Sequence, residues 1–318
     1  MFHKLLKNYK KCIVIVCKDI ERELYIMNNN FNDALLLCPV CKDKLIKEVS
    51  NKIYKCNNNH TYDIAKEGYV NLLISNQKNS KNPGDSKEMV LARVEFLSKG
   101  YYGILSDKIN EIIVECLKKD NEDKFNIMDL GCGEGYYLTN LKKYMDGENI
   151  KSNYYGMDVS KEAVKYASKT NKDCVWAVGN NFNIPASDKS IDCLLSVFSP
   201  IDIDECNRVL KDDGVFVRVL PRTNHLIQLR NIIYSEVHLN EKLYKASAYE
   251  NEYIKESNVT FDITLNKEEV LSLLKMTPHY WKSTAENKEK LDSYESLVIT
   301  IDMRIGVFQK KIEAHDTK

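Results

Sequence analysis

The stretch that decides the fold is DLGCGEGYY, residues 129–137, which follows the short apolar run FNIM. Its glycines, Gly131, Gly133 and Gly135, alternate directly after what we expect to be the first strand of a sheet. Glycine has no side chain, so backbone amides in such a turn can approach a ligand closely. The dinucleotide-binding pattern places its third glycine one residue later and leaves room for a pyrophosphate. Here Glu134 stands within the turn, and its carboxylate would repel a pyrophosphate but tolerate a cationic ligand.

Strand-like and helix-like segments alternate from this turn towards the C-terminus. The strand-like segments are NYYGMDVS, CVWAVGN, IDCLLSVFSP and GVFVRVLP, with helical patterns between them. This order predicts an α/β fold with a doubly wound, mostly parallel, Rossmann-like sheet. Residues 257–266 and 294–308 alternate apolar and polar side chains, so we expect them to complete the sheet.

Polar side chains follow the first strands of the predicted sheet. Asp129 ends the first strand and offers a carboxylate to an amino group, while Asp158 ends the second and is placed to accept ribose hydroxyls. Asn180 follows the third strand, where it can pair with an adenine edge. Together with the acidic glycine turn, these residues predict S-adenosylmethionine (SAM) as the ligand and a class I methyltransferase domain, rather than a nicotinamide enzyme.

The loop after the fourth strand contains Phe198, Ser199 and Pro200. In methyl-transferring folds of this kind, this loop faces the methyl acceptor. Phe198 is a candidate to stack on a flat base, and a backbone carbonyl near Pro200 is a candidate to accept a hydrogen bond from that base. A core phenylalanine followed by a turn proline is an equally good interpretation, and no residue stands out as the catalytic base.

A small cysteine-rich module precedes this domain. Cys38 and Cys41 form one short-spaced pair, and Cys56 and His60 form a second pair fourteen residues further on. Zinc prefers such sets of sulfur and nitrogen ligands in a tetrahedron. Because all positions are filled by protein side chains, we predict a structural zinc site. The alternative is a group of buried thiols beside a surface histidine.

Composition restricts the class of protein further. The chain has 318 residues, 43% of them hydrophobic, with 46 Lys and Arg against 46 Asp and Glu. This apolar content excludes a disordered protein, and no apolar run approaches the roughly 18 residues of a membrane span. Residues 1–99 hold 17 basic and 11 acidic side chains, which indicates a polyanion-binding end. The other cysteines are scattered, so we expect a reducing, cytoplasmic location.

An ordered series of motifs resembles a known family. After the CPVC and CNNNH motifs come YDIAKEGYVNLL (residues 62–73), PGDSKEMVLARVEFLSKGYY (residues 83–102) and DLGCGEGYY. This series, over residues 37 to 308, resembles the RlmA-type 23S ribosomal RNA (guanine-N1-)-methyltransferases. The resemblance implies a zinc-binding homodimer that acts on an RNA stem-loop, and it implies SAM contacts at the following positions: Tyr102, Gly133, Glu134 and His225. The segment PRTNHL around His225 departs from the family's glycine-rich pattern.

The resemblance and the motifs together divide the chain. We expect an N-terminal extension or start-site artefact over residues 1–33, a zinc-binding RNA-recognition module over 34–75, a linker and helical connector over 76–124, and the methyltransferase domain over 125–318. The expected function is methyl transfer to N1 of a guanine in a 23S rRNA stem-loop. N1 lies on the Watson–Crick edge, so the base must be flipped out. The alternatives are a class I methyltransferase for another RNA base or a small molecule, and a non-catalytic ribosome-assembly protein.

Overall fold

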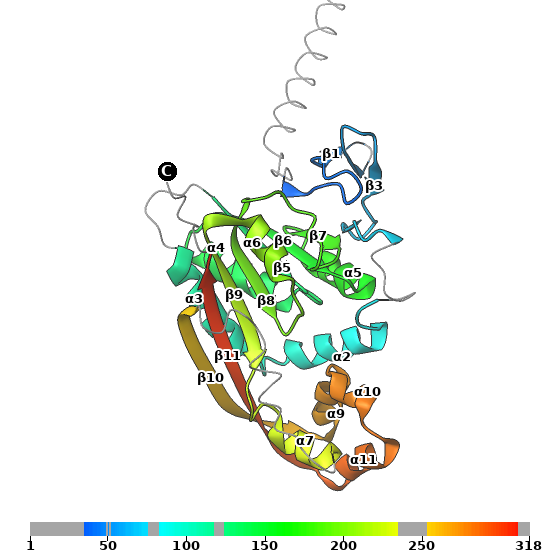
Figure 1. Cartoon of the computed structure of the whole chain (residues 1–318). Coiled ribbons are helices and arrows are strands. Elements are labelled where there is room, and N and C mark those ends of the chain that lie inside the picture. Colours follow the sequence, from blue (N-terminus) through cyan, green and yellow to red (C-terminus); the bar gives the residue numbers. More distant parts are fainter. Residues whose placement is uncertain are drawn as a thin grey trace, which may run out of the picture.

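An eight-stranded sheet forms the centre of the protein (Figure 1). The computed structural model describes residues 35–48, 50, 52–75, 83–117, 124–234 and 253–310, so the predicted N-terminal extension lies outside the described residues. The strands, in spatial order, are β10 (Tyr253–Asn266), β11 (Ser296–Gln309), β9 (Leu210–Pro221), β8 (Ile191–Val197), β5 (Phe125–Leu130), β6 (Ser152–Asp158), β7 (Val175–Val178) and β4 (Val70–Asn71).

The sheet has the predicted doubly wound, mostly parallel topology. Strands β9, β8, β5, β6 and β7 pair in parallel, whereas β11 runs antiparallel to both β9 and β10. The chain steps from β5 to β6 and β7 on one side, then returns to β8 and β9 on the other. Successive strands are thus added on opposite sides of β5, and the switch point of the strand order lies between β5 and β8. Doubly wound sheets bind ligands at such a switch point, at the carboxyl ends of the strands.

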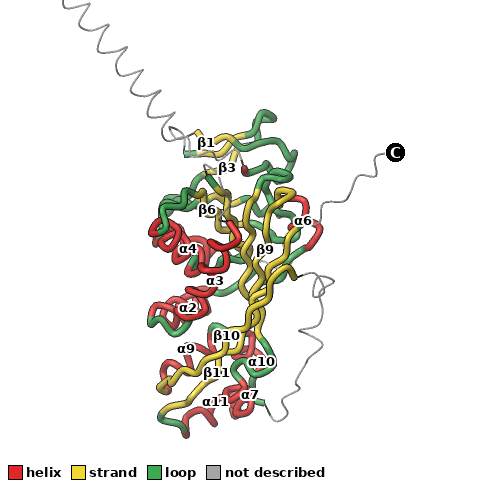
Figure 2. Tube along the Cα trace, turned by 90° about the vertical axis from the view of Figure 1, so that its left-hand side faces the viewer, coloured by secondary structure: helices red, strands yellow, loops and turns green. Residues whose placement is uncertain are grey.

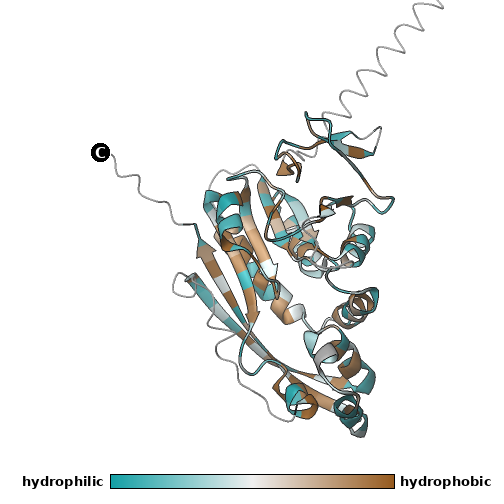
Figure 3. Ribbon diagram, turned by 45° about the vertical axis from the view of Figure 1, so that its right-hand side comes forward, coloured by the Kyte–Doolittle hydropathy of each residue, from teal (hydrophilic) through white to brown (hydrophobic). Residues whose placement is uncertain are grey.

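Helices cover both faces of the sheet. On one face lie α3 (Gly103–Leu117), α4 (Tyr136–Gly147) and α5 (Lys161–Thr170), and α6 (Ile203–Val209) packs on the other. Figure 2 shows α3 and α4 on one side of the strands and α6 on the opposite side. Apolar residues concentrate in the strands (Figure 3), where Ile127, Leu195 and Val217 are fully buried. Each such side chain contributes roughly 1.5–3 kcal/mol relative to an exposed one.

A long ribbon carries a helical lobe. Strands β10 and β11 pair from Tyr253–Phe308 to Asn266–Ser296, but only Met303–Gln309 of β11 pairs with β9, so the far half of the ribbon projects beyond the sheet. Between these strands the chain forms α9 (Lys267–Lys275), α10 (Pro278–Lys282), α11 (Ala285–Glu289) and a 3-10 turn (Lys290–Ser293), and α7 (Ile227–Ile233) packs beside them. Figure 1 shows this lobe next to α2 (Lys87–Ser98).

The connector before the central sheet is helical, as predicted. Ser86 caps α2 by accepting a hydrogen bond from the backbone N–H of Met89 at 3.3 Å. The helix stops before Gly100, whose φ of 81° lies in the left-handed region that glycine tolerates. Among the described residues no helix combines the length and apolar character that a membrane crossing would need.

The cysteine-rich module docks on the edge of the sheet. It contains a three-stranded antiparallel sheet of β1 (Ile46–Glu48), β2 (Ile53–Lys55) and β3 (Thr61–Asp63). The segment before β1 bonds to the methyltransferase domain through Leu37 N to Pro185 O (2.9 Å) and Ser187 N to Leu35 O (3.0 Å). After β3, strand β4 pairs in parallel with β7. The module is therefore held by backbone hydrogen bonds at both of its ends.

Candidate SAM site and zinc centre

The glycine turn after β5 adopts a conformation that requires glycine. Gly131, Gly133 and Gly135 have φ values of 75°, 56° and 85°. A Cβ on Gly131 would lie 2.0 Å from Oγ of Ser199, in the loop after β8. No side chain fits there, because the backbone of Gly131 lies directly against the side chain of Ser199. The close approach of a ligand to this turn stays a prediction.

Asp158 fastens this turn to the end of β6. Its Oδ2 accepts a hydrogen bond from the backbone N–H of Gly133 at 3.0 Å, and its Oδ1 accepts one from Ser160 N at 2.7 Å. The carboxylate is half-buried, and burial raises its pKa. Its position at the carboxyl end of the second strand is the one that we predicted for a ribose contact.

Two further carboxylates lie buried beside the turn. Asp129 is 1% exposed and Glu134 is 7% exposed. Asp129 Oδ1 and Glu134 Oε2 have no hydrogen-bond partner among the described residues. Burial raises the pKa of Asp129 well above its ordinary value and raises the pKa of Glu134 to about 7. Buried carboxylate oxygens without a hydrogen bond are costly, so this pair fits the positively charged groups at the methionine end of SAM.

Arg93, on α2, reaches the same turn and was missed by sequence reasoning. Its Nη1 lies 2.5 Å from Asp85 Oδ2 and 3.9 Å from Glu134 Oε2. Its Nη2 donates to the carbonyl of Met276 at 3.3 Å, at the end of α9. Arg93 was part of the motif PGDSKEMVLAR that carried the family resemblance. Helical periodicity, however, predicts only the helix and does not indicate which of its residues contacts another segment.

The loop after β8 presents an aromatic ring to solvent. Phe198 is 44% exposed, and its φ of 59° is unusual for a bulky residue. Its ring stacks on the imidazole of His225, with centroids 6.3 Å apart and planes 14° from parallel. The exposure excludes the alternative that Phe198 is a core residue. Burial lowers the pKa of His225, and the nearby charge of His279 lowers it further, so the imidazole is neutral at physiological pH.

Asn181 joins the loops that follow β7 and β8. Its Nδ2 donates to Ser199 Oγ at 3.0 Å and to the Pro200 carbonyl at 3.0 Å. The predicted adenine-pairing residue is its neighbour Asn180, whose Oδ1 accepts from the Phe182 N–H at 3.0 Å within the same loop. The adenine contact of Asn180 stays a prediction, and Asn181 is a site residue that the sequence did not indicate.

Tyr102 lies in the core below α2. It is 2% exposed and packs edge-on against Phe96, with ring centroids 5.7 Å apart. The residue lies in the turn between α2 and α3, and its contact with the cofactor stays a prediction.

The four predicted zinc ligands come together. Their ligand atoms all lie within 4.8 Å of one another, with Cys41 Sγ 3.7 Å from Cys56 Sγ and His60 Nδ1 3.6 Å from Cys38 Sγ. Zn–S bonds of about 2.3 Å and Zn–N bonds of about 2.0 Å predict tetrahedron edges of roughly 3.5–3.8 Å, so the cluster fits zinc. The hydroxyl of Tyr62 lies 3.0 Å from Cys38 Sγ and orients that ligand.

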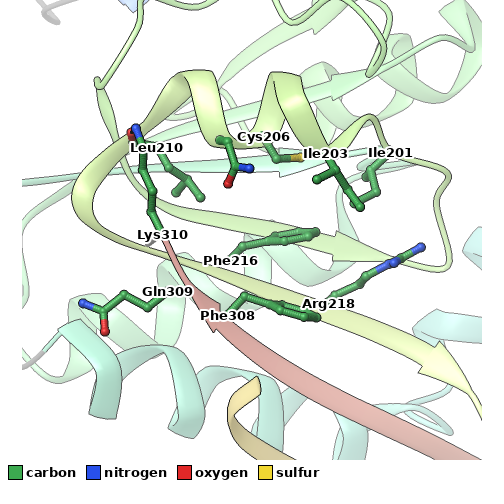
Figure 4. Close-up of a pocket in the computed structure, with 10 residues that line it drawn as sticks. Ile201, Ile203, Cys206, Leu210, Phe216, Arg218, Phe308, Gln309 and Lys310 are labelled. Atoms are coloured by element: carbon green, nitrogen blue, oxygen red, sulfur yellow. The ribbon is translucent and has the colours of Figure 1, made fainter. Parts of the chain in front are cut away.

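A separate hollow lies between α6 and the β9–β11 pair. Figure 4 shows Phe216 and Phe308 projecting into it beneath Cys206, with Arg218 at one end. None of the predicted site residues lines it. We therefore place the candidate cofactor site at the switch point between β5 and β8, where the glycine turn and the buried carboxylates meet.

The strand order, the glycine turn, the buried carboxylates and the cysteine and histidine cluster define a class I SAM-dependent methyltransferase with a structural zinc module. The family model described as "RlmA, N-terminal" matches residues 36–81, and one described as "Methyltransferase domain" matches residues 121–289. The "Putative 23S rRNA (guanine-N(1)-)-methyltransferase YxjB" of Bacillus subtilis is 31% identical over 89% of this chain and 100% of its own length. The 23S rRNA (guanine(748)-N(1))-methyltransferase of Streptomyces fradiae is 27% identical over 77% of this chain and 85% of its own length. The chain belongs to the RlmA-type 23S rRNA (guanine-N1-)-methyltransferase family.

Proposed function

We propose that the protein transfers the methyl group of SAM to N1 of a guanine in a stem-loop of 23S rRNA. The observation that carries this proposal is the contact between the zinc module and the catalytic domain. Lys42, in the first zinc knuckle, donates from Nζ to Asn183 Oδ1 at 2.5 Å. Asn183 belongs to the same loop as Asn181, which holds the Ser199 loop. The module therefore adjoins the acceptor side of the site, as an RNA-gripping element should.

The chemistry requires positioning more than a strong base. Guanine N1 carries a proton, and its lone pair is delocalised into the ring, so it is a poor nucleophile. SAM, when bound, supplies an electrophilic methyl group. The chain's own contribution is to hold the reacting atoms in line, which removes a large entropic part of the barrier. Asp129 and Glu134 hold the cationic end of the cofactor, and Asp158 holds its ribose.

Phe198 is the residue that we expect to hold the target base. Because N1 lies on the Watson–Crick edge, a paired guanine must leave its stack before it can react. Stacking on an aromatic side chain contributes about 1–3 kcal/mol per base, which offsets part of that cost. The Pro200 carbonyl accepts hydrogen bonds from Asn181 Nδ2 at 3.0 Å and from Ser199 Oγ at 3.5 Å. In place of the long Ser199 bond, the carbonyl is a candidate to accept a hydrogen bond from the N1–H group of the base.

The zinc module supplies positive charge for the RNA backbone. Lys44, Lys47 and Lys52 are exposed on it, near the ligand cluster. Lysines that neutralise phosphates release counterions, so RNA affinity should fall steeply with salt. We further propose a homodimer, as the family resemblance implies, in which two such modules flank the RNA. Sedimentation equilibrium tests this directly, and a monomer mass over the whole working concentration range would contradict it.

In vitro methylation tests the proposed function. Purified protein is incubated with tritiated SAM and fragments transcribed from 23S rRNA, and the RNA is then digested to nucleosides. The proposal predicts label in 1-methylguanosine, and none when the Asp129→Asn variant replaces the wild type. Label in another nucleoside would favour a methyltransferase for a different base. Tight binding of SAM and RNA without transfer would favour an assembly protein instead.

A further inference from the structure

The charges around the glycine turn are unbalanced for a zwitterionic ligand. The methionine end of SAM carries a carboxylate as well as an ammonium group. Asp129 and Glu134 suit the ammonium and the sulfonium, but they and the nearby Asp158 repel the carboxylate. A site with only these groups would discriminate against the natural cofactor. A cation is therefore required close to the turn.

Arg93 lies where that cation is needed. Its Nη1 is 3.4 Å from the position that a Cβ on Gly133 would occupy, so the guanidinium lies against the face of the turn. A guanidinium has five N–H donors. The contacts of Arg93 with Asp85 and Met276 are within hydrogen-bond distance, whereas Glu134 at 3.9 Å is too far for a hydrogen bond. The Arg93 side chain is 24% exposed, so it is not closed off from solvent.

The electrostatic surroundings agree with this placement. Arg93 is the cation whose charge counteracts the effect of burial on the pKa of both Glu134 and Asp158. Another cation in this area, Lys165, lies 3.9 Å from Glu67. Among the described residues, the contacts with Glu134 and Gly133 thus place Arg93, rather than a lysine, at the glycine turn.

We propose that Arg93 binds the carboxylate of SAM and so selects the complete amino-acid end of the cofactor. This inference rests on SAM as the cofactor and is independent of the RNA substrate. Arginine suits the role because its planar fork matches a carboxylate in a bidentate arrangement. Since Arg93 also contacts Asp85 and the end of α9, the ligand-free protein already holds its guanidinium at the turn.

Calorimetric titration with SAM and with decarboxylated SAM separates this role from a structural one. Wild-type protein should bind SAM more tightly than the decarboxylated analogue. Arg93→Gln should weaken SAM binding about 10- to 100-fold, the range for a hydrogen bond to a charged group. The same variant should leave decarboxylated SAM unchanged or bind it more tightly, because a cation that repels its ammonium is gone. Arg93→Lys should lie between wild type and Arg93→Gln for SAM.

Lys99→Gln is the matched control. Lys99 is the C-cap residue of the same helix and links it to α9 through Glu269, with Nζ 3.0 Å from Oε1. Among the described residues, no hydrogen bond or ion pair joins Lys99 to the glycine turn. This variant should bind both ligands like the wild type. Equal weakening of both ligands by Arg93→Gln would show that Arg93 only supports the fold and would overturn the proposal. Unchanged SAM binding in that variant would overturn it as well, whatever the result for RNA methylation. Circular dichroism checks that Arg93→Gln is folded. If it is not, the affinities of Arg93→Lys for SAM and for decarboxylated SAM are compared in its place, and equal weakening of both would likewise overturn the proposal.

Discussion

The ring of Phe198 lies nearly parallel to the imidazole of His225, with centroids 6.3 Å apart and an interplanar angle of 14°. Phe198 directly follows β8, and His225 lies in the loop after β9. Phe198 holds this position with a φ of 59°, a conformation that costs of order 1–3 kcal/mol in a non-glycine residue. A strained and exposed aromatic at the switch point of the sheet is better explained by a ligand than by packing.

Phe198→Ala should lower kcat/KM for RNA about 5- to 100-fold, because about 1–3 kcal/mol of base stacking is lost. Phe198→Tyr keeps the ring and should retain most of the activity. The affinity for SAM should be the same in all three proteins, which calorimetry can establish. Equal methylation rates for Phe198→Ala and wild type at limiting RNA would remove Phe198 from the acceptor site.

Gly131→Ala should abolish SAM binding, because its Cβ would meet Ser199 Oγ at 2.0 Å and Ser199 Cβ at 2.4 Å. Gly100→Ala is the matched control, because its φ of 81° is similar. Apart from its chain neighbours, no described residue has an atom within 4 Å of the added Cβ. That variant should lose only about 1–2 kcal/mol of stability from backbone strain. Adding Ser199→Gly to Gly131→Ala should restore part of the binding. Normal SAM affinity in Gly131→Ala alone would argue against the contact between the two loops.

The sheet could be predicted from the sequence because its signals are local. Apolar strands alternate with helical patterns, and the glycine turn follows the first strand directly. Such patterns determine the succession of strands and helices along the chain. They also place Asp129 and Asp158 at the carboxyl ends of two strands. The paired cysteine spacing likewise predicted the ligand cluster of Cys38, Cys41, Cys56 and His60, since short-spaced pairs bring their own ligands together.

The contacts between distant segments could not be predicted in this way. Arg93 reaches Glu134 across 41 positions of the chain, and Asn181 reaches Ser199 through side-chain hydrogen bonds. Both depend on how α2 and the loops pack on the sheet, which periodicity does not determine. The adjacent asparagines illustrate the limit, because the sequence indicated Asn180 while the structure has Asn181 bridging the loops.

Zinc removal should separate RNA binding from cofactor binding. We expect one zinc ion per chain by elemental analysis and its loss in Cys56→Ser. Cys116→Ser, which changes a cysteine of α3 outside the cluster, should keep the ion. The zinc-free protein should lose RNA affinity, yet bind SAM with a Kd close to that of the wild type. The reason is that, within the described residues, no hydrogen bond or ion pair joins the glycine turn to the ligand cluster. Loss of SAM binding together with zinc would contradict a purely structural, RNA-side role.

SAM binding should tighten as pH rises towards neutrality. Burial raises the pKa of Glu134 to about 7 in the ligand-free protein, and a bound cation favours the ionised form and so lowers that pKa. Binding therefore releases a proton below pH 7, and affinity should rise by up to about tenfold per pH unit and level off above it. Asp129, whose pKa is also raised, acts in the same direction. Calorimetry from about pH 5.5 to 8 should show this rise and a flatter profile for Glu134→Gln. An affinity that falls with pH over this range would contradict the assignment.

Primer extension on 23S rRNA from cells with and without the gene tests the central claim most directly. A methyl group at N1 blocks the Watson–Crick edge of guanine, so reverse transcriptase stops beside the modified base. We predict one stop at a guanine in a 23S stem-loop that disappears when the gene is deleted, returns with the wild-type gene and does not return with Asp129→Asn. The same pattern of stops in the presence and absence of the gene would contradict the claim that this protein methylates N1 of a 23S rRNA guanine.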